Sequence, residues 1–341
     1  MKWFYVLILF FATELFCMPC IADSPKSKDS IRVMVWNVLH GANDVTNGAE
    51  KTLKIIRDTN PDIVLLQESY DINDERPKLG EWLADELGWN QHQAESTHLC
   101  VLTPLEIETT FFHHEWHGVG AKLRDEMGRE MLTWSTWIDY RAFITYALRE
   151  NPAMSDDDLL ALESVGSNRL QQASAIIAHL SDTGQLKADI PLLVGGDWNC
   201  PSHLDWTVDT TRVYKRRRAL PLPVSKAMLA AGFTDTFRAL YPNPVQRPGI
   251  TWSPMFRVSG EGDEQVEQGF DRIDRLYLKN PTKPIGGWTL RPTAGHVLPK
   301  VWEDERMATL DRAFPSDHGA VVIDLEWKKT QSDLSLETKP N

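Results

Sequence analysis

Six short apolar runs, each bounded by residues that favour turns, constrain the fold of this chain more than any other feature. They have the length of buried strands and lie at residues 31–36, 63–66, 99–102, 192–194, 275–278 and 320–325. Helical patterns lie at residues 51–58, 81–87, about 156–180 and 224–231, and Ser155 is a predicted N-cap. Because strands and helices alternate, and several connections are typical of antiparallel pairs, we expect mixed α/β layers in a single domain.

Both ends of the chain are predicted to lie outside this domain. Residues 1–22 have the pattern of a signal peptide, with Lys2 before a short apolar run and small residues before a cut that would leave Asp23 first. An uncleaved anchor is the alternative, but Glu14 interrupts a run shorter than the roughly 20 residues of a membrane span. Residues 23–30 form a polar lead-in, residues 31–328 the domain and residues 329–341 a polar tail. We expect a secreted protein, extracellular or periplasmic, with no transmembrane segment after signal removal.

Charge and cysteine content narrow the possible functions. The net charge of −12 argues against a protein that holds nucleic acid by a general basic surface. One basic run, Lys215 to Arg218, either grips a phosphate-rich substrate or forms a solvated loop. Cys17 and Cys20 would leave with the signal peptide, and Cys100 and Cys200 could pair in an oxidising compartment. The sequence does not place these last two within bonding distance, so their redox state stays open.

Polar residues follow or begin the predicted strands at five places. The five motifs are Trp36-Asn37, Gln67-Glu68, Gly196-Asp197-Trp198-Asn199, Arg272-Ile273-Asp274 and Ser316-Asp317-His318. A single polar strand end is common and carries little information. Because the ends of strands in one domain can converge on one cleft, five of them together predict a functional site.

Three of these residues suit a hard divalent cation. Attack of water on phosphorus builds negative charge on the phosphoryl and leaving oxygens, and a cation held by carboxylates and amides neutralises it. Glu68 is the natural ligand, and Asn37 and Asp317 are further candidates. The expected ion is Mg²⁺ or Mn²⁺.

The remaining polar residues suit the proton transfers of the same reaction. Asp197 can position and activate the attacking water, and the Asn199 amide can donate a hydrogen bond to a phosphate oxygen. His318 can be a charged donor to the phosphate if a carboxylate holds it, and Asp274 is the candidate carboxylate. Phosphoester hydrolysis is therefore the predicted chemistry.

The order W-N, Q-E, G-D-x-N, R-I-D and S-D-H resembles the endonuclease/exonuclease/phosphatase superfamily, the DNase I-like phosphoesterases. The resemblance runs from Trp36 to His318. It implies an α/β (α+β) four-layer sandwich, in which two mixed β-sheets pack face to face with helices outside. It also implies the roles given above for the residues of the five motifs, with a metal-bound phosphate and an Asp-activated water.

The chain departs from the family pattern at one position. Many members carry a second histidine, in an N-T-H-L pattern, where this chain has Trp137. An indole N–H can donate one hydrogen bond but cannot shuttle a proton. We therefore expect altered handling of the leaving group, while a degenerate and inactive member and a slip in the alignment are the alternatives.

Other candidates are weaker. Trp137, His203 and Arg169 are candidate substrate-binding residues, although His203 could instead pack its loop and Arg169 could be structural. His113, His114 and His117 have metal-like spacing, but no helix pattern surrounds them, and a partly exposed strand or loop is preferred.

The substrate stays open between a small phosphoester, a lipid headgroup and nucleic acid. The leading hypothesis is a secreted, metal-dependent phosphodiesterase or phosphatase. The alternatives are an extracellular nuclease and a catalytically degenerate binding protein of the same fold. No obligate protein partner is implied.

Overall fold

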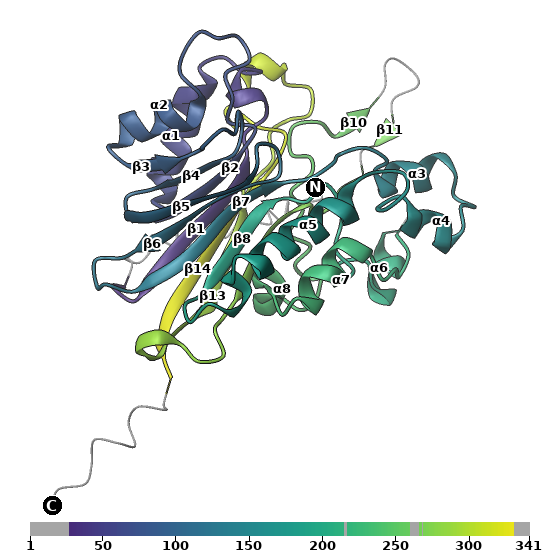
Figure 1. Cartoon of the computed structure of the whole chain (residues 1–341). Helices are drawn as coiled ribbons and strands as arrows, with labels where there is room; N and C mark the ends of the chain where they lie inside the picture. Colours follow the sequence, from purple (N-terminus) through teal and green to yellow (C-terminus); the bar gives the residue numbers. More distant parts are fainter. Residues whose placement is uncertain (1–26, 215–216, 260–265, 268, 331–341) are drawn as a thin grey trace, which may run out of the picture.

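The computed structural model describes residues 27–214, 217–259, 266–267 and 269–330 (Figure 1). The predicted signal peptide, residues 23–26 of the lead-in, residues 215–216 of the basic run and residues 331–341 of the tail lie outside the described residues. Within the described ranges, no helix combines the length and apolar character that a membrane span requires.

Two six-stranded mixed sheets form the centre of the molecule. The first has the order β13 (Trp288–Leu298), β14 (Ala320–Lys329), β1 (Ser30–Asn37), β2 (Ile63–Gln67), β4 (Cys100–Thr103) and β3 (Asn90–His92). The second has the order β5 (Glu106–His114), β6 (Gly118–Arg124), β7 (Glu130–Trp137), β8 (Leu192–Asp197), β12 (Asp274–Lys279) and β9 (Thr234–Asp235). Each sheet has one parallel pair, β1–β2 and β7–β8. Strands β10 (Val258–Ser259) and β11 (Val266–Glu267) form a separate two-stranded ribbon.

Strand β1 explains why the predicted strands are apolar on both faces. Val33 and Val35 point into the core between the two sheets, together with residues such as Leu193 and Leu276 of the second sheet. Met34 and Trp36 alternate with them and pack on the outer face of the first sheet. A strand with two buried faces reads as a continuous apolar run, because successive side chains point to opposite sides.

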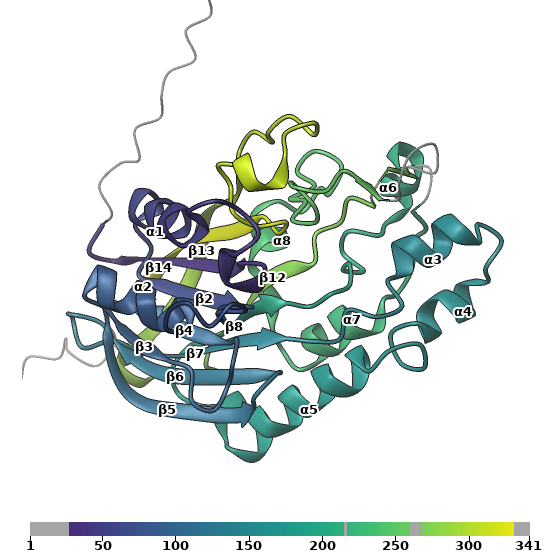
Figure 2. The ribbon, with the colours of Figure 1, turned by 90° about the horizontal axis from the view of Figure 1, so that it is seen from above.

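Helices cover both outer faces, so the protein has four layers. Helices α1 (Gly48–Thr59) and α2 (Leu79–Leu87) pack on the first sheet, through Leu53, Ile56 and Leu83. Helices α5 (Arg169–Asp182) and α7 (Pro223–Ala230) pack on the second, through Ile176 and Met228. Figure 2 shows these two pairs on opposite sides of the molecule. The predicted four-layer α/β sandwich is confirmed.

The predicted strands are all present, and three of the four predicted helices are confirmed. The helix expected over about residues 156–180 is wrong, because two helices occupy it, α4 (Asp156–Ala161) and α5. They pack in different places: Leu159 of α4 lies in a cluster with α3 (Ile144–Glu150), whereas Ile176 of α5 packs on the second sheet. Ser155 caps α4 as predicted, since its hydroxyl accepts a hydrogen bond from the Asp158 amide at 3.1 Å.

The two cysteines of the described chain are free and buried in separate layers. Cys100 lies between the first sheet and its helices, and Cys200 between the second sheet and its helices. The possible pairing of Cys100 with Cys200 is therefore not made. Two short helices, α6 (Val208–Val213) and α8 (Thr236–Leu240), complete the described elements that bear on the site.

Candidate active site

Strand ends from both sheets meet at one edge of the sandwich. In the first sheet, Asn37 at the end of β1 lies beside Gln67 at the end of β2, and Glu68 follows directly. In the second sheet, Asp197 at the end of β8 pairs directly with Asp274 at the start of β12. The predicted catalytic and metal-binding residues thus gather into one group, here called the polar cluster, which consists of Asn37, Glu68, Asp197, Asn199, Asp274, Asp317 and His318.

The backbone is specialised where the polar cluster is built. Glu68 and Asn199 both have left-handed backbone conformations, with φ of 57° and 48°. This conformation is costly for residues other than glycine and is concentrated at functional sites. Gly196, one residue before Asp197, packs so closely that a Cβ there would overlap the carbonyl of Thr136 on the neighbouring strand β7. A glycine is therefore required for the second sheet to place Asp197.

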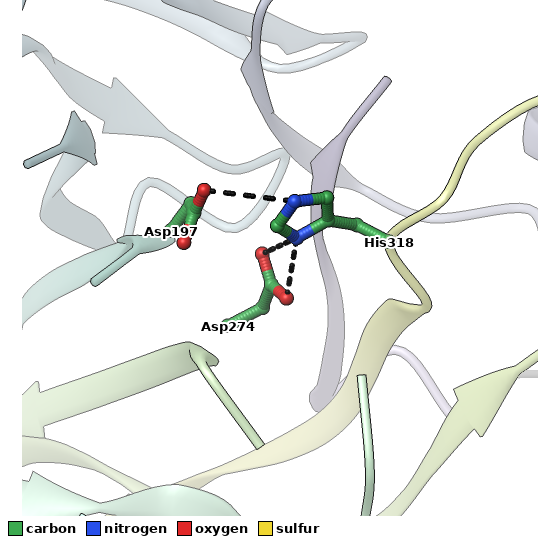
Figure 3. Close-up of side chains that lie close together, drawn as sticks. All are labelled: Asp197, Asp274 and His318. Carbon is green, nitrogen blue, oxygen red and sulfur yellow. Dashed lines mark hydrogen bonds and ion pairs between the residues drawn. The ribbon is translucent and has the colours of Figure 1, made fainter. Parts of the chain in front are cut away.

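His318 is held between two carboxylates (Figure 3). Its Nδ1 lies 3.0 Å from Oδ2 of Asp274, and its Nε2 lies 3.8 Å from Oδ2 of Asp197. Burial lowers the pKa of His318, but the negative charges of Asp274, Asp197 and Asp317 outweigh it and raise the pKa well above the ordinary value. The imidazole is therefore a cation at neutral pH and can donate a hydrogen bond from Nε2.

Asp197 is buried and is held by amides. Its Oδ2 accepts hydrogen bonds from Nδ2 of Asn37 at 3.1 Å and from Nδ2 of Asn199 at 3.0 Å. Its Oδ1 accepts one from the backbone N–H of Asn199 at 2.8 Å. Burial raises the pKa of Asp197 to about 7, although the positive charge of His318 opposes this. A carboxylate with that pKa can accept a proton near neutral pH.

Asn199 lies differently from what its predicted role requires. Its side-chain amide donates one hydrogen bond to Asp197 and a second to the carbonyl oxygen of Ile138 at 2.8 Å. Both amide hydrogens are thus occupied inside the protein. In this arrangement Asn199 orients the carboxylate of Asp197, and a contact with phosphate would need the amide to turn.

Two groups of side chains in the polar cluster offer oxygen or nitrogen ligands for a metal ion. Asp197, Asp274 and His318 offer ligand atoms within 4.8 Å of one another, but the imidazole of His318 carries a proton and is hydrogen-bonded to Asp274. Glu68 and Asp317 offer only hard oxygen ligands. Oδ1 of Asp317 is buried and accepts no hydrogen bond from any described residue, and burial raises the pKa of Asp317 to about 7. Mg²⁺ and Mn²⁺ fit this second group, because these hard cations prefer oxygen ligands and their positive charge stabilises buried carboxylates.

One pocket of about 430 Å³ opens over the polar cluster. Both polar and aromatic side chains line it, and two of the aromatic ones, Tyr70 and Trp252, lie against Glu68 and His318. Among the described residues that line it there is no lysine or arginine. The lining consists of Leu39, His40, Glu68, Tyr70, Trp116, Trp137, Tyr140, Phe143, Tyr146, Asp197, Asn199, Trp252, Ile273, Asp317 and His318.

Trp137 lines this pocket at the end of β7, where the family pattern has histidine. Its indole N–H is buried and has no hydrogen-bond partner among the described residues. Because it is buried, this N–H is not available to donate a hydrogen bond to a ligand in the pocket. Trp137 instead offers the pocket part of its ring.

The other two predicted substrate-binding residues lie outside the pocket. Arg169 is fully buried and donates hydrogen bonds to the carbonyl oxygens of Asp139, Arg141 and Ala142, which is a structural role. His203 lies 2.7 Å from the hydroxyl of Ser225 at the start of α7, so it packs its loop.

The two described arginines of the basic run bond to the protein itself, and the histidine-rich segment lies in a strand and a turn. Arg217 pairs with the buried carboxylate of Asp271 at 2.9 Å, and Arg218 bonds to the carbonyl of Met154 and to Asp156. Neither guanidinium is available to grip a substrate. His113 and His114 end strand β5 and His117 follows in a turn, as the strand-or-loop interpretation predicted.

His40 and Tyr70 are pocket residues that the sequence motifs do not reveal. The backbone N–H of His40 and the hydroxyl of Tyr70 lie 3.3 Å and 3.5 Å from Oε2 of Glu68, so both orient this carboxylate. His40 reaches it through a left-handed turn, in which Leu39 and Ala42 also have positive φ. No local sequence signal indicates this turn, although its position three residues after Asn37 places it at the same sheet edge.

Similar proteins support the architecture. The Caenorhabditis elegans protein F14F9.5, described as uncharacterized, is 31% identical over 308 residues, which are 89% of this chain and 93% of the relative. A humanized Danio rerio TDP2 matches with a TM-score of 0.53 and 14% identity, over 87% of this chain and 99% of that one. The human Nocturnin catalytic domain matches with a TM-score of 0.53 and 16% identity, over 88% of this chain and 95% of that domain.

An AP endonuclease from Archaeoglobus fulgidus matches with a TM-score of 0.51 and 16% identity, over 86% of this chain and 98% of that one. At these identities the three solved structures show a shared fold. The family model for the Endonuclease/Exonuclease/phosphatase family matches residues 34–318, the span that contains all five polar motifs. The chain therefore belongs to the Endonuclease/Exonuclease/phosphatase family, whose members are metal-dependent phosphoester hydrolases.

Proposed function

We propose that this protein is a secreted, metal-dependent phosphoester hydrolase. The observation that carries the proposal is the His318 imidazolium, held by Asp274 on one side and facing Asp197 on the other, at the base of a pocket that also contains Glu68 and Asp317. A protonated donor, a carboxylate with a pKa of about 7 and oxygen ligands for a cation are the groups that this hydrolysis requires.

Each group has one task in the reaction. Asp197, oriented by Asn37 and Asn199, accepts a proton from the attacking water. His318 donates a hydrogen bond from Nε2 to a phosphoryl oxygen, and Asp274 keeps its imidazole oriented and charged. Water thus forms the new P–O bond while the P–O bond to the alcohol breaks. The alkoxide leaves with that bonding pair and takes a proton from solvent, to which Asp197 returns the proton that it accepted.

Glu68, Asp317 and Asn37 would hold Mg²⁺ or Mn²⁺. When bound, the ion neutralises charge that develops on the phosphoryl group. Oδ1 of Asp317 accepts no hydrogen bond from a described residue, and Glu68 and Asp317 both line the pocket, which supports these two ligands.

A small phosphoester or a headgroup fits this pocket better than a nucleic-acid chain. A Danio rerio TDP2 with a TM-score of 0.53 has been solved with a single-strand DNA product. In this chain, Arg217 and Arg218 are bound to their own protein, and the described residues that line the pocket include no lysine or arginine. A polyanion gains its affinity from such side chains.

The test is hydrolysis of bis-p-nitrophenyl phosphate and p-nitrophenyl phosphate by the purified mature protein, with Mg²⁺, with Mn²⁺ and with a chelator. We expect p-nitrophenol to be released with either metal. This hydrolysis should be lost with the chelator and in the Asp197→Asn and His318→Ala variants. Asp182→Asn, at the exposed end of α5, is the matched control and should behave as the parent. Equal release with and without metal, or no release from any ester, would support the degenerate binding protein instead.

Secretion is tested separately. Residues 1–22 fused to a reporter should direct it out of the cytosol, with cleavage before Asp23 found by N-terminal sequencing of the product. Retention of an uncleaved fusion in the membrane would favour the anchor.

A further inference from the structure

Seven Tyr, Trp and Phe side chains line the pocket. Three of them are joined by ring contacts, and we call these the aromatic wall: Trp116, Trp137 and Tyr140. Trp116 lies in the turn after β5, Trp137 ends β7, and Tyr140 lies in the loop that follows. Trp116 is 40% exposed and Tyr140 is 64% exposed. Large aromatic side chains exposed at a pocket are unusual unless they contact a ligand.

The rings of the aromatic wall are tilted toward one another. The centroids of Trp116 and Trp137 are 6.1 Å apart at 55°, and those of Trp137 and Tyr140 are 6.2 Å apart at 49°. Neighbouring rings at such angles do not form the parallel slot that sandwiches a flat base. They present several faces to one compact group, and a cation gains from each face within about 6 Å of its centroid.

The surroundings of the aromatic wall favour a positive ligand. Among the described residues that line the pocket no lysine or arginine competes for the ring faces. The ring of His98 packs behind the wall, with its centroid 4.6 Å from that of Trp116 and 5.6 Å from that of Trp137. The carboxylates of Glu68, Asp197 and Asp317 line the same pocket, where the His318 imidazolium and the proposed metal ion offset part of their negative charge.

Ring faces make up most of the surface that the aromatic wall offers to a ligand. The indole N–H of Trp137 is buried, so this residue offers no accessible donor. A quaternary ammonium group needs no hydrogen-bond partner and is the cation that aromatic surroundings bind best relative to water. An ammonium with N–H donors would leave them unsatisfied against ring faces.

We propose that the aromatic wall binds a quaternary ammonium group, so that the substrate is a phosphoester of a choline-type alcohol. This inference rests on the proposed hydrolysis for its reaction and adds only a binding group. The zwitterion places its phosphate at the polar cluster and its ammonium on the aromatic wall. The same chemistry occurs in soluble choline phosphoesters and in lipid headgroups.

The first experiment measures binding without catalysis. Tetramethylammonium is titrated into the metal-free protein, and tryptophan fluorescence is followed, with sodium chloride at equal ionic strength as reference. We expect a saturable change that is lost in the double variant Trp116→Leu, Tyr140→Leu. The Phe112→Leu variant, which removes a half-exposed ring outside the pocket lining, should keep the change. No saturable change in the parent protein overturns the inference, whatever the activity.

The second experiment compares p-nitrophenyl phosphorylcholine with its carbon isostere, the 3,3-dimethylbutyl ester, which lacks only the charge. We expect kcat/KM about tenfold higher for the choline ester, mainly through KM. Trp116→Leu should lower kcat/KM for the choline ester about fivefold more than for the neutral ester, and Trp116→Phe should retain most of the preference. Equal kcat/KM for both esters in the parent overturns the inference but leaves the proposed hydrolysis standing.

The source of the headgroup is distinguished with glycerophosphocholine and with phosphatidylcholine vesicles. Hydrolysis of glycerophosphocholine supports a soluble ester as the substrate, and hydrolysis of phosphatidylcholine supports a lipid. A clear preference for nucleotide esters over both would overturn the inference in favour of base recognition.

Discussion

The polar cluster and the aromatic wall share one pocket, but they are built in opposite ways. The polar cluster comes from strand ends of both sheets, and Asp197 alone accepts three hydrogen bonds. The aromatic wall comes from a turn, the last residue of a strand and a loop, and two of its three members are exposed. The difference indicates that the core of the fold positions the catalytic residues, whereas residues of peripheral turns and loops select the ligand.

Substitutions in the polar cluster are expected to have the largest effect on kcat, and this effect should be the same for every substrate. Asp197→Asn and His318→Ala each remove a charged group at the reacting phosphate, so kcat should fall by about a thousandfold for every ester that the protein hydrolyses. The measurement is steady-state kinetics with two esters of different alcohols. A loss confined to one alcohol would contradict the division between the two regions.

The next effect concerns the metal. Glu68→Gln removes one negative charge from the proposed ligands, so the Mg²⁺ concentration for half-maximal activity should rise by about ten- to a hundredfold. Calorimetric titration of Mn²⁺ should show the same loss of affinity in the absence of substrate. Glu81→Gln on α2 is the matched control and should leave both values unchanged. Unchanged metal affinity in Glu68→Gln would instead direct attention to Asp197, Asp274 and His318.

His98 joins the two regions, and its titration should weaken the fold. Its Nδ1 accepts a hydrogen bond from the N–H of Glu68 at 3.3 Å, and its Nε2 lies 3.2 Å from the carbonyl oxygen of Trp116. Burial lowers its pKa to about 3, whereas an exposed histidine titrates near 6.5. Between these values the unfolded chain takes up a proton that the folded chain does not, so lowering the pH destabilises the fold.

The measurement is urea denaturation between pH 6.5 and 4.5, with the free energy of unfolding compared in the parent and in His98→Gln. The parent should lose about 1 kcal/mol more per pH unit than the variant, since one fewer group titrates on unfolding. Parallel slopes would show that His98 is not the titrating group.

The smallest effect tests the packing beneath the polar cluster. A Cβ on Gly195 would lie 2.6 Å from Cδ1 of Leu65 and 2.7 Å from Cγ2 of Val35, both in the first sheet. Gly195→Ala should therefore destabilise the fold by about 1–2 kcal/mol and lower kcat severalfold, because it pushes the sheets apart. Leu65→Val in the same chain should restore part of both losses, as measured by denaturation and kinetics. Additive losses would contradict the steric explanation.

The sequence predicts the polar cluster far better than the aromatic wall, for a physical reason. Glu68 and Asp197 directly continue buried apolar strands, so their place in the chain determines their place in space. Trp116 and Tyr140 lie in irregular segments, whose course depends on contacts that are distant in the chain. The same limit explains the wrong helix over residues 156–180, where the apolar pattern continues although its two halves pack on different partners.

The candidate site was predicted as a set of residues, but some of its bonding was not. The amide of Asn199 holds Asp197 rather than facing open space, and the indole N–H of Trp137 is buried. Arg217 carries a charge that suits phosphate, yet Asp271 has already bound it. Residue type and spacing predict which groups meet, whereas the direction of each donor depends on neighbours from other strands.

Because residues from two sheets meet at the polar cluster, the site is sensitive to amino-acid substitutions in the core. Asn37 ends a strand of one sheet and Glu68 follows its neighbour, whereas Asp197 and Asp274 lie in the other sheet. A single direct hydrogen bond between these two pairs of residues joins Asn37 to Asp197. Any substitution in the shared core that slides one sheet against the other misaligns the reactants before it unfolds the chain. The turnover rate should therefore respond to smaller changes in core packing than the melting temperature does. Some core substitutions that leave the protein folded should still lower its activity.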